Sequence, residues 1–79
     1  MNLVNKLKTA YAQGQKQKQR EKTVAEEALV ASLFFEMNAK FISELYRQIY
    51  QRKIEEEGQI TKPEGFLETR VYGFGYRFA

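Results

Sequence analysis

Residues 23–54 most constrain what this chain can fold into, because their apolar positions recur with the period of an α-helix. On a helical projection Phe34, Phe41 and Leu45 fall on one side, whereas Glu36 and Lys40 fall on the other. The apolar half is wider than the stripe of roughly 100° expected for a helix that lies on one neighbour. The pattern therefore predicts a long helix whose apolar arc must be covered by more than one surface.

Both ends of this helix can be predicted from local signals. Thr23 and Glu26 have the spacing of a capping box, in which each side chain bonds to the backbone of the other residue. Gly58 can adopt the left-handed conformation that often follows a helix. Three glutamates, 55–57, lie at the negative end of the helix dipole and favour fraying after Ile54. We thus expect a central helix over residues 23–57.

The chain is short and lacks the usual reinforcements of small proteins. It has 79 residues and contains neither cysteine nor histidine, so disulfides and histidine-containing zinc sites are excluded. A single core of this size leaves little stability to spare. Because the central helix has more apolar surface than the rest of the chain can conveniently cover, we expect another protein or a second copy of the chain as a partner. A homodimer is the form we favour.

The N-terminal residues 1–13 form a second amphipathic pattern. Leu3, Val4 and Leu7 begin a helical apolar stripe, Asn2 can cap its start, and Gly14 can stop it. We expect a short helix that folds back on the central helix. The alternatives are a helix that inserts into a partner's groove or one that lies on a membrane surface, and the small apolar face argues against the membrane.

Residues 14–22 are a polar, basic connector without an apolar side chain. Residues 1–23 carry six cations against Glu21, a net charge of +5, although the whole chain carries only +3. A solvated link between two helices explains this composition, and the residues are themselves good helix formers. Phosphate contact is the functional alternative. It would use four cations: Lys16, Lys18, Arg20 and Lys22.

The last segment, residues 58–79, changes character abruptly. Residues 62–65, Lys-Pro-Glu-Gly, fit a type I turn that could join a short strand at residues 59–61 to a longer strand from Phe66 onward. Beyond Phe66 the aromatic residues alternate with other side chains, which indicates a strand. The expected fold is one small domain, residues 1–79, that is mainly α with a small β element, either a hairpin or a single strand.

The aromatic tail allows three interpretations. It can pack across the central helix, extend the sheet of another protein, or stack unpaired bases beside Arg70 and Arg77. In the last case Tyr72 and Tyr76 would be the stacking residues.

The composition argues against catalysis. The chain has no histidine, cysteine or aspartate and no glycine-rich phosphate loop, so general acid–base work would fall to Glu, Lys or Tyr. We expect no enzymatic activity, no cofactor and no metal. The most apolar window contains Glu36 and Lys40, which excludes a membrane span, and we expect a cytoplasmic protein.

These features favour a small non-catalytic protein that binds another protein, as an adaptor, an inhibitor or an accessory subunit. The alternative is a nucleic-acid-binding protein that uses the basic segment, residues 16–22, with the C-terminal aromatics. The expected protein-binding residues are Phe34, Phe35, Phe41, Leu45, Ile49, Tyr72, Phe74, Tyr76 and Phe78.

Overall fold

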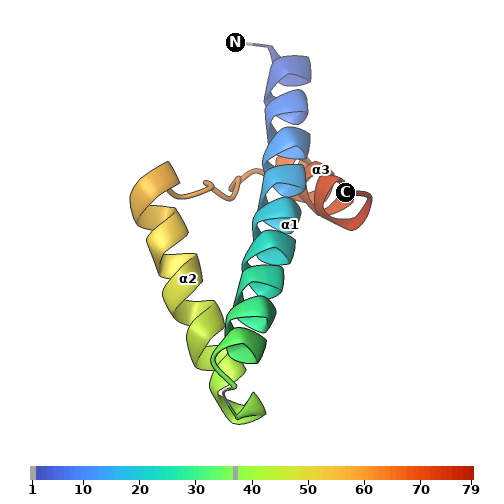
Figure 1. The fold of residues 1–79 in the computed structure, drawn as a ribbon. Helices are drawn as coiled ribbons and strands as arrows, with labels where there is room; N and C mark the ends of the chain where they lie inside the picture. The colour runs from blue at the N-terminus through green and yellow to red at the C-terminus, as the bar shows by residue number, and fades with distance from the viewer. Residues whose placement is uncertain (1, 37) are drawn as a thin grey trace. The chain divides into compact units, whose positions relative to one another are not determined.

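The computed structural model describes residues 2–36 and 38–79, and within these residues it is entirely helical (Figure 1). The elements are α1 (Leu3–Phe34), the short 3₁₀ helix η1 (Ala39–Phe41), α2 (Ile42–Glu57) and α3 (Phe66–Arg77). No strand occurs in the described part of the chain. The expectation of a mainly α fold with a small β element is therefore wrong. Residues 1 and 37, which fall in two of the expected segments, lie outside the described residues.

The chain forms two compact units that share α1. One unit contains residues 1–19 and 60–79, so it combines the first half of α1 with α3. The other contains residues 20–59, which are the second half of α1, η1 and α2. We call them the α1–α3 unit and the α1–α2 unit and describe each by itself.

A single helix occupies the segments in which a short helix, residues 1–13, and a connector, residues 14–22, were expected. α1 begins as predicted, because the Asn2 side-chain oxygen accepts a hydrogen bond of 2.9 Å from the Asn5 backbone N–H. It then continues through the connector, whose Gln, Lys, Arg and Glu residues favour helix. Gly14 does not stop the helix, and Thr23 lies inside it rather than at a start.

The expected central helix over residues 23–57 is broken near its middle. α1 ends at Phe34, and Glu36 adopts a left-handed conformation with φ of 51°. The Glu36 backbone N–H bonds to the Leu33 carbonyl at 3.2 Å, and after η1 the chain returns as α2. The wide apolar arc gives the physical reason. By turning back, the two halves of this segment cover part of each other, which a straight helix cannot do.

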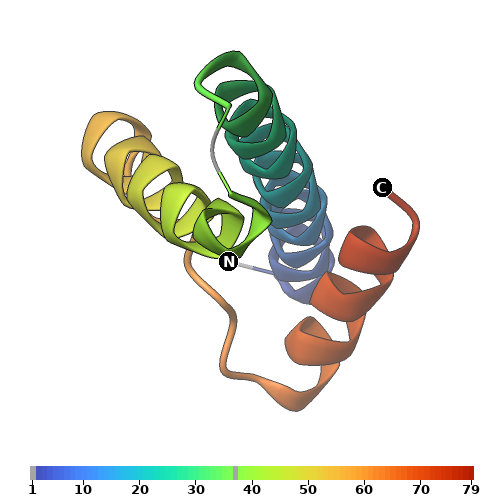
Figure 2. The ribbon, with the colours of Figure 1, turned by 60° about the horizontal axis from the view of Figure 1, so that its bottom comes forward.

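In the α1–α2 unit, the end of α1 and α2 lie side by side (Figure 2). Val24 and Ala28 on α1 are fully buried, and Ser32 one turn further is nearly so. Such small side chains at four-residue spacing allow a second helix to approach closely. Lys53 on α2 lies 3.6 Å from Glu27 on α1, which fixes the antiparallel register.

The acidic end of α2 stays helical to Glu57, beyond the residue where fraying was expected. Arg20 on α1 explains this extension. Its guanidinium donates a 2.7 Å hydrogen bond to the Gly58 carbonyl and lies 3.5 Å from the Glu57 carboxylate. A cation thus offsets the carboxylates at the negative end of the helix dipole, and it comes from a residue 37 positions earlier in the chain.

The aromatic tail forms the helix α3 rather than a strand or hairpin. Its half-buried or buried positions have the spacing of a helix and are Glu68, Val71, Tyr72, Gly75 and Tyr76. The sequence of this segment fits the period of a strand and that of a helix, because its aromatic residues alternate and also recur every four residues. Favourable dipole charges support the helix, with Glu68 in its first turn and Arg77 in its last.

Two glycines allow α1 and α3 to touch backbone to backbone in the α1–α3 unit. A Cβ atom on Gly14 would overlap the Tyr72 carbonyl oxygen and lie 2.8 Å from the Tyr76 nitrogen. A Cβ atom on Gly75 would in turn overlap the Tyr11 carbonyl oxygen and lie 3.2 Å from the Tyr11 Cα atom. The helix crossing therefore depends on both glycines, and Gly75 cannot be replaced without moving backbone atoms.

The crossing generates a prediction at Gly14. Gly14→Ala should lower the free energy of unfolding by about 1–3 kcal/mol, because the added methyl group forces the helices apart. The matched control is Gly73→Ala in α3, where a Cβ atom meets nothing within 4 Å. That control should stabilise the protein by up to about 1 kcal/mol, since alanine favours helix over glycine. Thermal unfolding followed by circular dichroism measures both. Equal effects of the two substitutions would contradict the close crossing.

The turn generates a second prediction at Glu36. A left-handed φ is unfavourable for a residue with a Cβ atom and easy for glycine. We expect Glu36→Gly to be more stable than Glu36→Ala by about 1 kcal/mol. Because both variants remove the carboxylate, their difference reports the backbone alone. Chemical denaturation measures it, and a more stable alanine variant would refute the left-handed turn.

Candidate functional site

A groove of about 460 Å³ lies on the second half of α1, at the end of the α1–α2 unit where the chain turns. Val30, Ala31, Phe34 and Phe35 form its apolar floor, and Glu26 and Glu27 form its acidic edge. We call it the apolar groove. The rings of Phe34 and Phe35 contact each other edge to face, with centroids 5.1 Å apart. This edge-to-face contact gives the floor two rings at a defined angle.

The groove is open to solvent. Phe34 is 79% exposed and Phe35 is 69% exposed, although both are large apolar side chains. Glu27 is within 3.6 Å of Lys53, whereas no ion pair holds Glu26 among the described residues. The surface therefore offers apolar contact beside an uncompensated negative charge.

Many other large apolar side chains are exposed in the described part of the chain, as in a protein that has a binding partner or forms an oligomer. Phe41, like Phe34 and Phe35, is among the residues predicted to bind a protein, and it is exposed too. Leu45 and Ile49 of the same prediction are instead half-buried on α2.

The C-terminal aromatics divide into two sets. Tyr72 and Tyr76 are half-buried, and each has a cation near its ring: Lys62 at 6.0 Å from Tyr72 and Lys18 at 4.7 Å from Tyr76. Phe74 and Phe78 are exposed, and their rings stack with centroids 6.2 Å apart. Phe74 and Phe78 are thus accessible to solvent, whereas the rings of Tyr72 and Tyr76 are half-buried and each lies near a lysine.

The four cations of the expected phosphate-binding segment have different surroundings in the structure. Lys18 lies over Tyr76, and Arg20 binds Gly58 and Glu57, which leaves Lys16 and Lys22 exposed. Side chains two positions apart point to opposite sides of a helix, so the four cations cannot share one face of α1. Their alternation in sequence would gather them only on an extended strand.

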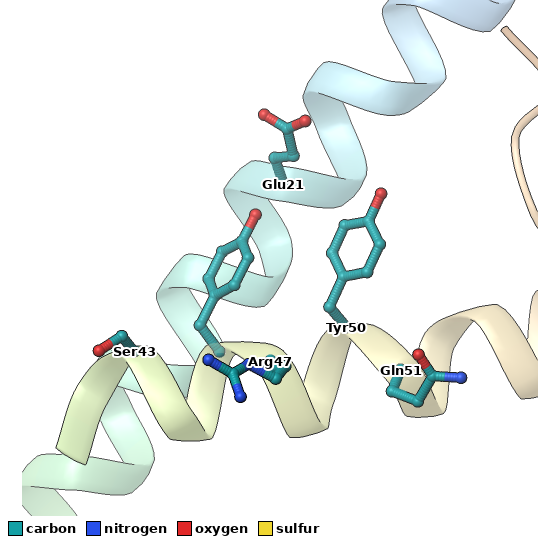
Figure 3. A pocket seen from close by; sticks show the side chains of 6 residues that line it. Glu21, Ser43, Arg47, Tyr50 and Gln51 are labelled. Atoms are coloured by element: carbon teal, nitrogen blue, oxygen red, sulfur yellow. The ribbon is translucent and has the colours of Figure 1, made fainter.

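A second site lies between α2 and the second half of α1, with a volume of about 430 Å³. The Tyr50 ring points from α2 towards α1, where Glu21 lies (Figure 3). The ring of Tyr46 stacks on that of Tyr50 at 5.9 Å. Burial, then the Glu21 carboxylate, then Tyr50 raise the pKa of Tyr46 above its ordinary value of 10.0, so all three causes of this shift favour the neutral phenol.

Neither site carries the chemistry of a metal centre. Among residues 2–36 and 38–79, no three carboxylates gather closely enough to hold a metal ion. Within the same ranges, no helix has the length and apolar character needed to cross a membrane.

Comparisons with protein-family models, with curated proteins and with solved structures find no significant match to this chain.

The sequence predicted Phe34 and Phe35 as protein-binding residues, and the structure places both in the apolar groove with Glu26, which was expected to cap a helix. Arg70 and Arg77 were expected beside the aromatic residues of a strand, and the helix α3 instead brings Phe66 and Arg70 together on its outward side. The helical spacing of Phe66, Arg70, Phe74 and Phe78, four residues apart, was the signal that could have revealed it.

Arg20 generates a prediction about the α1–α2 unit. Its side chain is only 10% exposed, and it donates a hydrogen bond to the Gly58 carbonyl at the end of α2. Arg20→Gln should lower the free energy of unfolding by about 1–2 kcal/mol. Lys22→Gln is the matched control, since Lys22 is exposed, and should change stability by less than about 0.5 kcal/mol. Urea denaturation of the two variants decides the point, and equal stabilities would show that Arg20 is a surface cation only.

Proposed function

We propose that this chain is a non-catalytic protein-binding protein and that its apolar groove binds an amphipathic helix from a partner protein. The exposure of Phe34 and Phe35 beside Glu26 carries the proposal. A helix that lays its apolar face into such a groove is a common mode of peptide recognition. An adaptor, an inhibitor and an accessory subunit all work in this way, and none needs catalytic residues.

Charge indicates the kind of helix. The groove has Glu26 and Glu27 along one edge, so a helix with Lys or Arg beside its apolar face complements it. The alternative occupant of the apolar groove is a second copy of the chain, in a homodimer. Two copies meeting groove to groove would bring their Glu26 side chains together, and the repulsion of like charges favours a different, basic partner.

The size of the groove indicates the strength of binding. Complete burial of Val30, Phe34 and Phe35 would contribute roughly 5–9 kcal/mol in total, at about 1.5–3 kcal/mol for each side chain. Association itself costs on the order of 4–15 kcal/mol. The apolar contact and the edge charges together therefore support only a weak, reversible complex.

The proposal predicts a charge preference that can be measured with synthetic peptides. A labelled amphipathic helix of Leu and Lys should bind the full chain more tightly than its Leu and Glu counterpart, by fluorescence anisotropy. Glu26→Lys should weaken binding of the Lys peptide and strengthen that of the Glu peptide, because it reverses the unpaired charge of the groove.

Two exposed phenylalanines provide a matched pair of variants. Phe34→Ser should weaken binding of the Lys peptide at least about tenfold, since it removes an anchor worth about 1.5–3 kcal/mol. Phe66→Ser, at a residue that is 75% exposed but lies in the α1–α3 unit, should leave it unchanged. Equal losses in the two variants, or equal affinity for the two peptides, would refute the groove as the binding site.

Light scattering after size-exclusion chromatography distinguishes the two occupants. We expect the wild-type mass to be that of a monomer at micromolar concentration. A dimer that Phe34→Ser converts to a monomer would instead assign the groove to a second copy of the chain.

A further inference from the structure

The outward side of α3 is a second surface that the apolar groove does not explain. Phe66, Arg70, Phe74 and Phe78 follow one another at four-residue spacing, and Arg77 lies beside this row. Phe66 is 75% exposed and Phe78 is 67% exposed. We call these five residues the α3 face. The opposite side of α3, with Tyr72, Gly75 and Tyr76, is the side that meets α1.

Cations and rings are interleaved on the α3 face. The guanidinium carbon of Arg70 lies 5.8 Å from the centre of the Phe66 ring. The rings of Phe74 and Phe78 are nearly parallel, with an interplanar angle of 22°. Glu68, the acidic residue of α3, does not belong to this row and is half-buried, with its carboxylate next to Gly65. The face therefore combines flat apolar rings with positive charge and carries no acidic side chain of its own.

The charge of the whole α1–α3 unit has the same sign. Residues 1–19 and 60–79 contain seven cations against Glu64 and Glu68, a net charge of +5. Residues 20–59 contain six cations against eight glutamates, a net charge of −2. A ligand of the α3 face is therefore attracted by a positive field and is itself anionic.

Two requirements together identify the class of ligand. It must supply negative charge for Arg70 and Arg77 and flat π surfaces for the phenylalanine rings. Single-stranded nucleic acid supplies both, since every base has a π face and every nucleotide carries a phosphate. A duplex hides its base faces in the stack. A lipid surface favours a helix whose cations are separated from its apolar side, whereas the cations here lie among the rings.

We propose that the α3 face binds single-stranded nucleic acid, with bases stacked on Phe66, Phe74 and Phe78 and phosphates paired with Arg70 and Arg77. This site differs from the phosphate-binding segment expected from the sequence, because Lys18 and Arg20 are held by Tyr76 and Glu57. It is also independent of the apolar groove, which lies in the other unit of the chain.

Fluorescence anisotropy of the full chain with short labelled oligonucleotides tests the proposal. A single-stranded oligonucleotide should bind more tightly than the duplex of the same sequence. Phe74→Ala should weaken this binding about 5- to 150-fold, the range for removal of a stacking side chain. Replacing Arg70 and Arg77 by Gln should reduce the slope of log affinity against log salt by roughly 1.4, or about 0.7 for each phosphate contact.

The controls distinguish binding at the α3 face from binding at the apolar groove. Phe34→Ala, at a residue that is 79% exposed in the α1–α2 unit, should leave oligonucleotide binding unchanged. Circular dichroism checks that every variant keeps its helices. The proposal is overturned if no oligonucleotide binds at low salt, if Phe74→Ala binds as tightly as the wild type, or if the duplex binds equally well. Preference for anionic vesicles or an acidic peptide over the oligonucleotide would overturn it too.

Discussion

Small residues at four-residue spacing line the buried side of α1, and the rest of the structure depends on this narrow contact. Ala10 and Gly14 form it in one unit, and Val24, Ala28 and Ser32 form it in the other. Small side chains allow neighbouring helices to come close, but they bury little apolar area themselves. The large apolar residues of α1 therefore remain outside the contact and are available to other molecules.

This constraint connects the fold to the proposed functions. Val30 and Phe34 lie on α1 away from Val24 and Ala28, so they stay exposed once α2 has packed. On α3 the same division appears, because Gly75 allows close contact on one side while Phe74 and Phe78 remain on the other. In each unit the small residues thus serve internal packing and large apolar residues remain exposed, with opposite net charges in the two units.

Polar contacts over long sequence separations fix how the α1–α2 unit closes. Arg20 reaches Glu57 and the Gly58 carbonyl, and Lys53 reaches Glu27. The ion pairs are partly exposed and contribute modestly to stability, whereas the hydrogen bond of the nearly buried Arg20 contributes more. Their greater effect is on register, since the position of each charge specifies which turns of α1 and α2 lie opposite each other.

Local signals in the sequence determined much of the helical structure. The Asn2 cap and the helical apolar periodicity of residues 42–57 are properties of neighbouring residues, and the structure has both, whereas the extension of α2 to Glu57 involves the distant Arg20. The exposed phenylalanines of the protein-binding prediction, Phe34 and Phe35, also follow from an apolar arc too wide for one neighbour.

Tertiary structure alone decided the turn at Glu36, the continuity of α1 through Gly14, and the helical state of the aromatic tail. In each case the local sequence permits two conformations of similar free energy. Gly14 can end a helix or admit a neighbour, and the tail fits both a strand and a helix. Contact with a distant segment then selects one of them, because packing α3 onto α1 at Gly14 and Gly75 outweighs the weak preferences of the residues themselves.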